Sequence, residues 1–360
     1  MDVNAQVAGF LRDLSFAQTS QQKMWGYKRA SSSIMRLEQQ LTELRDVSGA
    51  LPKISGIGPA SARVIREVLD AGVSATVENA IDESGKRAEV DRRRALRRHF
   101  LSRAEVLRVL ADQSLTGPRL EDYRGDFQMH SEWSDGVTTL SEIVEACQSR
   151  GYTCAAVTDH SHGLKIAGGM TMEEAADQRR AIDTLNARSD GFRLLQGIEA
   201  NIAADGRLDL SDEESSQFEI VLAAPHSSLR KAHDQTDRML TAVRNPRVRI
   251  LAHPRGRMSG SRAGVIARWP EVFAEAASLG VAIEIDGDPS RQDLDHTLAT
   301  EARQAGCLFA LDSDAHSTAQ LAYAETAIAH ARLAGIPTDR VVNCWPFERL
   351  SAWLDDRRSR

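Results

Sequence analysis

The chain has 360 residues, a formal net charge of −6 at pH 7 and a hydrophobic content of 42%. No run approaches the roughly 18 uncharged apolar residues of a membrane span, and the N-terminus lacks the features of a secretory signal, so we expect a cytoplasmic protein. The four cysteines form no CxxC pair, which argues against a zinc ribbon or a dithiol redox site.

A chain of this length exceeds what one hydrophobic core usually supports, so we expect two domains. The charges are divided unevenly between them. Residues 1–120 contain 19 Lys and Arg against 14 Asp and Glu, whereas the remaining residues contain 26 against 37. A basic first part suits a polyanionic partner, and an acidic second part suits metal binding.

Residues 1–85 are predicted to form a helical domain, because apolar residues recur there at helical spacing. These residues are Val7, Phe10, Leu11 and Leu14, followed by Ile34, Leu37, Leu41 and Leu44. We therefore expect several short helices before the first glycine-rich turn.

The segment LPKISGIGPASARVIREVLDAG, at about residues 51–72, looks like a helix-hairpin-helix. Gly56 and Gly58 permit a tight turn, and Pro59 suits the first position of a helix. Such a turn directs the backbone N–H groups of a helix N-terminus toward solvent, where a nucleic-acid phosphate can bind. We predict DNA contacts at Gly56, Gly58 and Arg63; an ordinary corner between two helices is the alternative.

Residues 86–123 are predicted to be a basic helical linker. The stretch KRAEVDRRRALRRHFLSR places five arginines within two helical turns. Such a row can follow the phosphates of DNA, or it can be a solvated helix face, as most charge runs are, and both interpretations stay open. If it binds DNA, we expect the contacts at Arg93, Arg94 and Arg97.

From residue 124 the pattern changes to apolar runs that alternate with helical stretches. The predicted strands are residues 155–157, 194–198, 220–224, 248–252, 281–285 and 308–311. Strands alternating with helices indicate an α/β fold with a parallel sheet. A TIM-like barrel is favoured over an open sheet, because the loops at the carboxyl edge of a barrel face one shared pocket.

Residues able to bind a metal ion lie at or just beyond the ends of these runs. They are His130, Asp135, His160, Glu199, His226, His253, Asp314 and His316. Imidazoles mixed with carboxylates favour zinc or manganese, whereas an all-oxygen set favours magnesium or calcium. One such residue at a strand end is usually an ordinary loop residue, but eight in this order predict a metallohydrolase.

The motifs HSEWSDG, TDHS, GIEANI, PHSS, AHPRGR and SDAHS resemble, in order, those of the PHP (polymerase and histidinol phosphatase) superfamily. The stretches HPRGRMSGSR and IEIDGDPSRQDLD are most similar to the PHP domain of bacterial family X DNA polymerases. The resemblance implies that residues 124–360 form a distorted (β/α)7 TIM-like barrel with a trinuclear metal centre. The helical residues 1–85 resemble the small lyase-type domain that opens the same polymerases.

The chain also departs from this pattern. About 38 residues separate Ser84 from Tyr123, too few for a polymerase palm, so we expect no polymerase activity. Val64 stands where the resemblance implies a lyase lysine, and we predict no Schiff-base chemistry. The usual HxH of the first motif is Gln128-Met129-His130, and Gln128 offers only a weak carbonyl oxygen.

The resemblance implies two to three divalent ions, Mn²⁺ or Zn²⁺, with Fe²⁺ also compatible with these ligands. The first position would be held by His130, Glu199 and Asp314, with Gln128 as a marginal ligand. The second would lie between Glu199, His226 and His253, and the third between Asp135, His160 and His316.

Catalysis is assigned to Glu199, His226 and Asp314. Arg255 and Arg257, just past the strand that ends near His253, are expected to hold phosphate oxygens together with Arg262. Surface loop arginines are the alternative interpretation, and Lys165 is a weaker candidate for the same role.

These features predict a metal-dependent phosphoesterase that acts on DNA ends, as a 3′–5′ exonuclease or a 3′-end phosphatase or phosphodiesterase. The expected partner is DNA, either single-stranded or at 3′ ends. Two alternatives stay open: a phosphomonoesterase for a small molecule of the nucleotide or histidinol-phosphate type, and a DNA-binding scaffold with weak catalysis.

Overall fold

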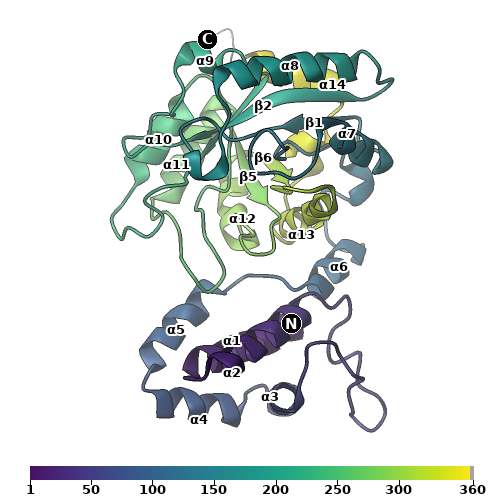
Figure 1. The fold of residues 1–360 in the computed structure, drawn as a ribbon, viewed down its shortest axis with the longest axis vertical. Coiled ribbons are helices and arrows are strands. Elements are labelled where there is room, and N and C mark those ends of the chain that lie inside the picture. Colours follow the sequence, from purple (N-terminus) through teal and green to yellow (C-terminus); the bar gives the residue numbers. More distant parts are fainter. Residues whose placement is uncertain (357–360) are drawn as a thin grey trace. The chain divides into compact units, whose positions relative to one another are not determined.

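The computed structural model describes residues 1–356, which divide into two compact units. One unit comprises Met1–Asp112 with the short segment Ser259–Ser261, and the other comprises Gln113–Met258 and the residues from Arg262 onward (Figure 1). The division falls at Asp112, so the first part of the predicted linker belongs to the helical unit. No helix among the described residues is long and apolar enough to cross a membrane.

The first unit is entirely helical. Its helices are α1 (Val3–Ala17), α2 (Gln21–Met35), α3 (Pro59–Ala71), α4 (Ala75–Ser84), α5 (Arg87–Leu96) and α6 (Arg103–Ala111). The side chain of Asp2 caps α1, and α3 begins with a proline and ends at Gly72 in the left-handed conformation, as the sequence predicts. Val7, Leu11 and Val64 are fully buried in the core that joins these helices.

The predicted helix over Leu37–Leu44 is wrong, because α2 ends at Met35 and no helix occurs in residues 36–58. Side chains take the backbone donors of this stretch instead. Asn4 accepts from the N–H of Leu41, and Asp46 accepts from the N–H groups of Ser48 and Ala50, which competes with helix formation. Only the second helix of the predicted helix-hairpin-helix, α3, is therefore present.

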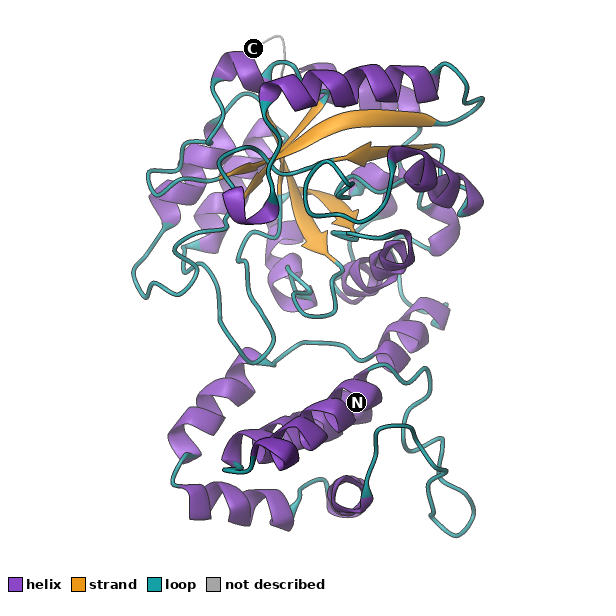
Figure 2. Cartoon of the chain, viewed as in Figure 1, coloured by secondary structure: helices purple, strands orange, loops and turns teal. Residues whose placement is uncertain are grey.

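The second unit is built on one parallel sheet, with its strands in chain order (Figure 2). They are β1 (Cys154–Val157), β2 (Arg193–Asn201), β3 (Ile220–Ala224), β4 (Val248–Leu251), β5 (Ala282–Asp286) and β6 (Leu308–Asp312). The central part of each strand agrees with the sequence prediction. Parallel neighbours in sequential order place all carboxyl ends at one edge of the sheet, as a curled TIM-like barrel requires.

A seventh, irregular segment, residues 124–130, lies between β1 and the end of β6. The N–H of Ala156 donates to Asp126 at 2.9 Å, the N–H of Thr158 donates to Met129 at 2.8 Å, and the N–H of His130 donates to Ala315 at 2.8 Å. Three residues of this closing segment thus span two residues of β1, which is the mismatch of a β-bulge. The predicted α/β barrel is confirmed, with this segment in the seventh strand position.

Helices precede, separate and follow the strands along the chain. They are α7 (Leu140–Ser149), α8 (Met172–Asn186), α9 (Asp212–Ser215), α10 (Thr236–Arg244), α11 (Trp269–Leu279), α12 (His296–Ala305), α13 (Ala324–Leu333) and α14 (Phe347–Asp356), with short 3-10 helices η1 (Leu120–Asp122), η2 (Lys165–Ala167), η3 (Thr318–Tyr323), η4 (Thr338–Arg340) and η5 (Val342–Cys344). Capping boxes begin α7, α8 and α9, in which Thr139, Thr171 and Ser211 pair with glutamates three residues later.

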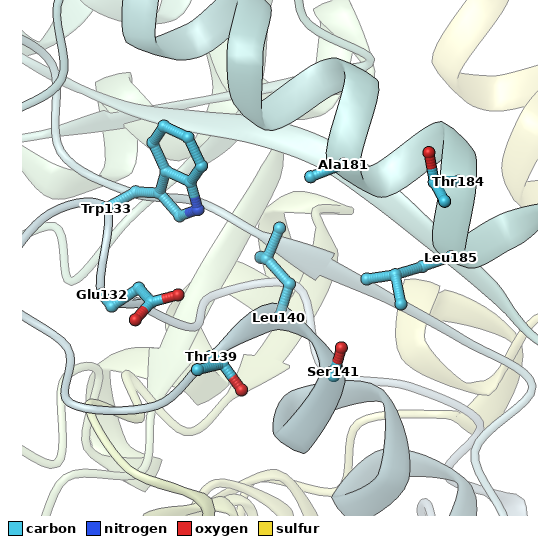
Figure 3. A pocket seen from close by; sticks show the side chains of 8 residues that line it. All are labelled: Glu132, Trp133, Thr139, Leu140, Ser141, Ala181, Thr184 and Leu185. Atoms are coloured by element: carbon cyan, nitrogen blue, oxygen red, sulfur yellow. The ribbon is translucent and has the colours of Figure 1, made fainter.

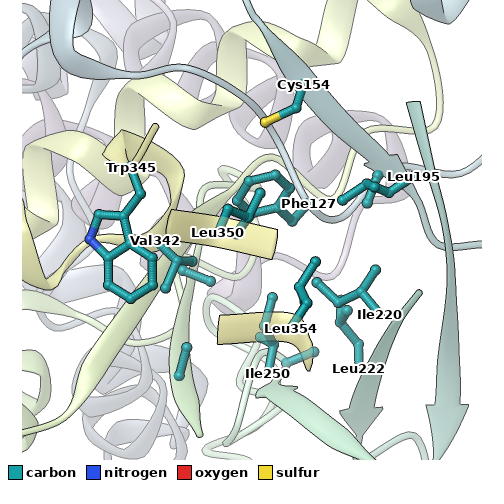
Figure 4. Close-up of a cluster of buried hydrophobic side chains, with 14 of the residues drawn as sticks. Phe127, Cys154, Leu195, Ile220, Leu222, Ile250, Val342, Trp345, Leu350 and Leu354 are labelled. Atoms are coloured by element: carbon teal, nitrogen blue, oxygen red, sulfur yellow. The ribbon is translucent and has the colours of Figure 1, made fainter. Parts of the chain in front are cut away.

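The barrel core contains residues from all six strands together with Phe127 of the closing segment (Figure 4). Leu350 and Leu354 of α14 pack into the same cluster, next to Ile250 of β4 and Leu222 of β3. Small residues, among them the alanines of β1, β3, β5 and β6, leave room for these larger side chains. The packed core fixes the positions of the strands, and the polar side chains of the site extend from the loops at their carboxyl ends.

Candidate metal centre

The eight predicted ligands meet at the carboxyl edge of the sheet. His130 lies on the closing segment, and Asp135 lies in the turn after it. Glu199 lies near the end of β2. The other candidates follow strands: His160 follows β1, His226 follows β3, His253 follows β4, and Asp314 and His316 follow β6. Only β5 of the described strands contributes no predicted ligand. The parallel sheet thus brings together residues that lie up to 186 positions apart in the sequence.

Glu199 is the centre of this arrangement, and its side chain is fully buried. Its Oε1 lies 2.8 Å from Nε2 of His253 and 3.2 Å from Nε2 of His226. Its Oε2 lies 3.0 Å from Nδ1 of His160 and 3.5 Å from Nε2 of His130. One carboxylate therefore contacts four imidazoles from four different segments.

Asp135 organises a second set of contacts. Its Oδ1 lies 3.4 Å from Nε2 of His316, 3.5 Å from Nε2 of His160 and 3.9 Å from Nδ1 of His130. The structure thus contains two groups whose ligand atoms all lie within 4.8 Å of one another. One consists of His130, Asp135, His160 and His316, and the other consists of His160, Glu199 and His226.

Several of these polar atoms are buried without a hydrogen-bond partner. They include Oε2 of Glu199 and Nδ1 of His130, His160 and His226. Oε2 of Glu199 and Nδ1 of His160 lie 3.0 Å apart and still do not form a hydrogen bond. An unsatisfied buried polar atom costs about 1–3 kcal/mol, and a divalent cation between the two atoms would satisfy both. The donors present therefore fit a metal ion.

The charges of the site shift its pKa values strongly. Burial alone would lower the pKa of His160, but the carboxylates of Glu199 and Asp135 outweigh it and raise the pKa to about 10. Burial likewise opposes protonation of His316, and Asp135 and Asp314 raise its pKa to about 9. Without metal, protonated imidazoles therefore neutralise the carboxylates, and a bound cation would replace those protons.

The backbone at two candidate ligands adopts uncommon conformations. His253 has a φ of 24° and Asp314 a φ of 52°, both in a region that residues other than glycine rarely occupy. Gly136 allows the turn after the first motif to pack closely, because a Cβ there would lie 2.3 Å from the carbonyl oxygen of His130. Such strain accumulates where side-chain positions are set by function.

Comparison with known proteins agrees with this geometry. A family model described as PHP domain matches residues 126–259. Residues 126–259 thus carry a PHP domain. The resemblance inferred from the six motifs is thereby confirmed for the barrel, whereas the likeness of the helical unit to a lyase-type domain stays a prediction.

Two curated relatives each match about two thirds of the chain. The DNA polymerase/3′-5′ exonuclease PolX of Bacillus subtilis is 37% identical over 236 residues, which cover 65% of this chain and 41% of the relative. The chain thus spans less than half the length of that relative. The probable phosphatase YcdX of Escherichia coli is 29% identical over 255 residues, covering 65% of this chain and 95% of the relative.

Solved structures also match a part of the chain. The histidinol phosphate phosphatase of Lactococcus lactis, in complex with zinc, L-histidinol and phosphate, has a TM-score of 0.41 and 15% identity, over 57% of this chain and 92% of that chain. The histidinol phosphatase described as putative from Listeria monocytogenes has a TM-score of 0.43 and 11% identity, over 55% and 97%.

The three metal positions implied by the resemblance stay a prediction, and the two compact ligand groups of the described residues cover them only in part. Asp314 and His253 belong to neither compact ligand group of the described residues. Gln128 is completely buried, and neither atom of its amide has a hydrogen-bond partner. Oδ1 of Asp314 lies 3.1 Å from Nε2 of His130, but its Oδ2 faces a guanidinium group, that of Arg291.

The arginines predicted to hold phosphate are bound elsewhere in the PHP domain. Nη1 of Arg257 lies 2.9 Å from Oδ2 of Asp295, and Nη1 of Arg255 lies 3.4 Å from the same oxygen. Nε of Arg262 donates to the carbonyl of Gly256. These guanidinium groups thus fix loops beside the site and are not directed at the ligand groups, and Lys165 stands in the exposed η2 turn.

Arg291 is the site residue that the sequence interpretation missed. Its Nε lies 3.4 Å from Oδ2 of Asp314 and 3.7 Å from Oδ2 of Asp286. The carboxylates of Asp314 and Asp286 outweigh the effect of burial and raise its pKa further. The available signal was that β5 is the one predicted strand without a ligand, although the polar loop GDPSRQDLD follows it.

The predicted DNA contacts of the helical unit differ in their surroundings. Arg94 and Arg97 both pair with the buried Asp13, and Arg93 pairs with Glu89. Arg63, in contrast, is exposed on α3. Gly56 has a φ of 81° in the turn before α3, and Gly58 caps that helix. The turn and Arg63 are therefore more open to a ligand than the α5 arginines.

A separate hollow of about 470 Å³ lies beside the first motif (Figure 3). It is lined by Glu132, Trp133, Thr139, Leu140, Ser141, Ala181, Thr184 and Leu185. None of these residues belongs to either ligand group, and most of them are uncharged. The hollow adjoins the loop that carries Asp135, but it lacks the groups needed for phosphoester chemistry.

Proposed function

We propose that this chain is a metal-dependent phosphoesterase that hydrolyses phosphoester bonds at the 3′ ends of DNA. The observation that carries the proposal is the convergence of the two ligand groups around Glu199 and Asp135, in a chain that is 37% identical to Bacillus PolX over 236 residues. That relative is a DNA polymerase and 3′-5′ exonuclease by name, which supports a DNA substrate here.

The side chains of the site would hold two or more divalent ions, which we propose to be Mn²⁺ or Zn²⁺ because imidazoles accompany the carboxylates. Bound ions would supply a water nucleophile at neutral pH and stabilise charge on the phosphoryl oxygens. Glu199 and His130 are fully buried and anchor the centre. Asp135 and His316 have side chains 36% and 30% exposed, so the phosphate would approach from their side.

The helical unit is proposed to bind the DNA strand. Its turn at Gly56 and Gly58 precedes the N-terminus of α3, where backbone donors and the positive end of the helix dipole favour a phosphate. Arg63 is exposed on the same helix and adds a charge. Because the α5 arginines already pair with carboxylates of their own unit, the proposal places the principal contact on α3.

A second candidate function is hydrolysis of a small phosphomonoester. It is favoured by the alignment with YcdX, a probable phosphatase, because the matched region covers 95% of that relative. A PHP domain with this ligand set would then act without the helical unit.

The test is to load the pure protein with Mn²⁺ or Zn²⁺ and supply single-stranded, 3′-recessed and 3′-phosphorylated oligonucleotides beside a panel of nucleotides and sugar phosphates. We expect shortening or dephosphorylation of the oligonucleotides and its loss in His226→Ala. His162→Ala is the matched control, because His162 is exposed and belongs to neither ligand group. Turnover restricted to small phosphates would favour the second function, and no turnover of either class by metal-loaded protein would leave a DNA-binding scaffold.

A further inference from the structure

We propose that Arg291 takes the place of a metal ion: the centre holds two divalent ions, and the guanidinium group of Arg291 supplies the third positive charge. The inference rests on the proposed metal centre and deepens it. It concerns the region of Asp314 and His253, the two predicted ligands that lie outside both compact ligand groups of the described residues.

Arg291 is held rigidly in this region. Its N–H donates to the carbonyl of Asp288 at 2.9 Å, and its own carbonyl accepts from Nε of Arg257 at 2.9 Å. Arg257 is in turn fixed by Asp295 at 2.9 Å. The role of Arg257 is thus to support the loop that presents Arg291.

The guanidinium group of Arg291 forms ion pairs, without a hydrogen bond, with the carboxylates of Asp314 and Asp286. Nε lies 3.4 Å from Oδ2 of Asp314 and 3.7 Å from Oδ2 of Asp286, and both aspartates are buried. The charge of Arg291 also interacts with Glu199 and His253. An arginine does not release its proton in proteins, so this positive charge is permanent.

Gln128 replaces the first histidine of the usual HxH motif, so the same edge of the barrel has one imidazole ligand fewer. It stands two residues before His130 on the closing segment, and both atoms of its buried amide are without a hydrogen-bond partner. An amide is a weak ligand compared with an imidazole or a carboxylate. A third divalent ion would therefore lack one strong ligand and would be repelled by the guanidinium group in a poorly screened interior.

A fixed cation differs from a metal ion in its consequences. It needs no loading from solution, and its planar group can bind two oxygens of a phosphate at once. The side chain of Arg291 is 22% exposed, which leaves part of it accessible to a substrate. In this centre, two ions are exchangeable and the third charge is built into the chain.

To test the inference, the protein is loaded with Mn²⁺ and free ions are removed by gel filtration. Elemental mass spectrometry then gives the number of metal ions per chain. We expect two ions in the native protein, in Arg291→Lys and in Gln128→His, because each retains a cation at residue 291. The double variant Gln128→His with Arg291→Gln is expected to hold three. Arg244→Gln, which removes only an exposed ion pair with Glu275, is the control and should hold two.

Three ions in the native protein would overturn the inference, and so would two in a folded double variant whose circular dichroism matches that of the native protein. The native count requires no variant, so the inference stays falsifiable if the double variant does not fold. Zero or one ion in the native protein would contradict the proposed metal centre as well, whereas a count of three would leave that centre intact.

Discussion

The two units of the chain each bury a carboxylate among cationic groups, and the two sites differ in how these groups are satisfied. In the helical unit, Oδ2 of Asp13 lies 2.7 Å from Nε of Arg94, and its Oδ1 pairs with Arg97. In the barrel, Glu199 is surrounded by imidazoles, and its Oε2 has no hydrogen-bond partner.

The difference indicates which cluster is structural and which is a binding site. Guanidinium groups are permanently charged, so the pairs of Asp13 with Arg94 and Arg97 are complete within the chain. Imidazoles exchange their protons near neutral pH and bind transition metals when neutral. The cluster around Glu199 therefore needs protons or metal ions from solution, and the cluster around Asp13 does not.

The largest effect is expected for Glu199→Gln. The amide can no longer neutralise the surrounding imidazoles or bind metal as an anion, so turnover should fall at least about a hundredfold, more than is usual for a residue that merely supports a ligand. Phosphoester hydrolysis and metal content are the measurements. Glu173→Gln, at an exposed carboxylate on α8, should change neither. Full activity in Glu199→Gln would mean that the cluster is not the reacting centre.

Asp13→Asn should act on stability instead. It leaves two arginines without their shared buried partner, and because both arginines are partly exposed we expect a loss of about 2–3 kcal/mol in the free energy of unfolding of the helical unit. Urea unfolding followed by circular dichroism measures this loss. Asp70→Asn, which removes an exposed partner of Arg45, is the control and should cost well under that amount. The metal content of both variants should be native, and a reduced content in Asp13→Asn would contradict the comparison.

Metal binding should release protons. The folded, metal-free pKa values of His160 and His316 are raised from 6.5 to about 10 and about 9, so both imidazoles are protonated at pH 7 and must lose their protons to become ligands. About two protons should therefore leave at pH 7, and the apparent affinity for metal should rise with pH until pH 9–10. Calorimetry in buffers of different ionisation enthalpy counts these protons. Proton uptake, or affinity independent of pH between 6 and 9, would exclude His160 and His316 as ligands.

The smallest effect concerns DNA binding. Arg63→Ala should lower the slope of log affinity against log salt by about one, since one phosphate contact is lost. Fluorescence anisotropy with a labelled single strand at several salt concentrations gives the slope. Arg207→Ala, at an exposed arginine of the barrel unit, should leave it unchanged. An equal slope for Arg63→Ala and the native protein would remove α3 from the proposed interface.

The sequence was sufficient to predict the strands and the convergence of the eight candidate ligands, because each candidate lies at or near the end of an apolar run and parallel strands bring these ends together. It was insufficient for residues 36–58, where the side chains of Asn4 and Asp46 compete for backbone donors. It also could not show that Arg255 and Arg257 pair with Asp295 or that Arg291 pairs with Asp314, because no spacing along the chain reveals these contacts.

The closing segment has one further consequence. The backbone that seals the barrel wall, through the hydrogen bonds of Asp126 and Met129 to β1, also presents His130 to the cations. Metal ions that bind this imidazole would therefore also stabilise the hydrogen bonds between the closing segment and β1, and loss of the ions would destabilise them. Metal binding and the stability of the barrel are thus thermodynamically linked, so we expect the barrel to be most stable when the metal ions are bound.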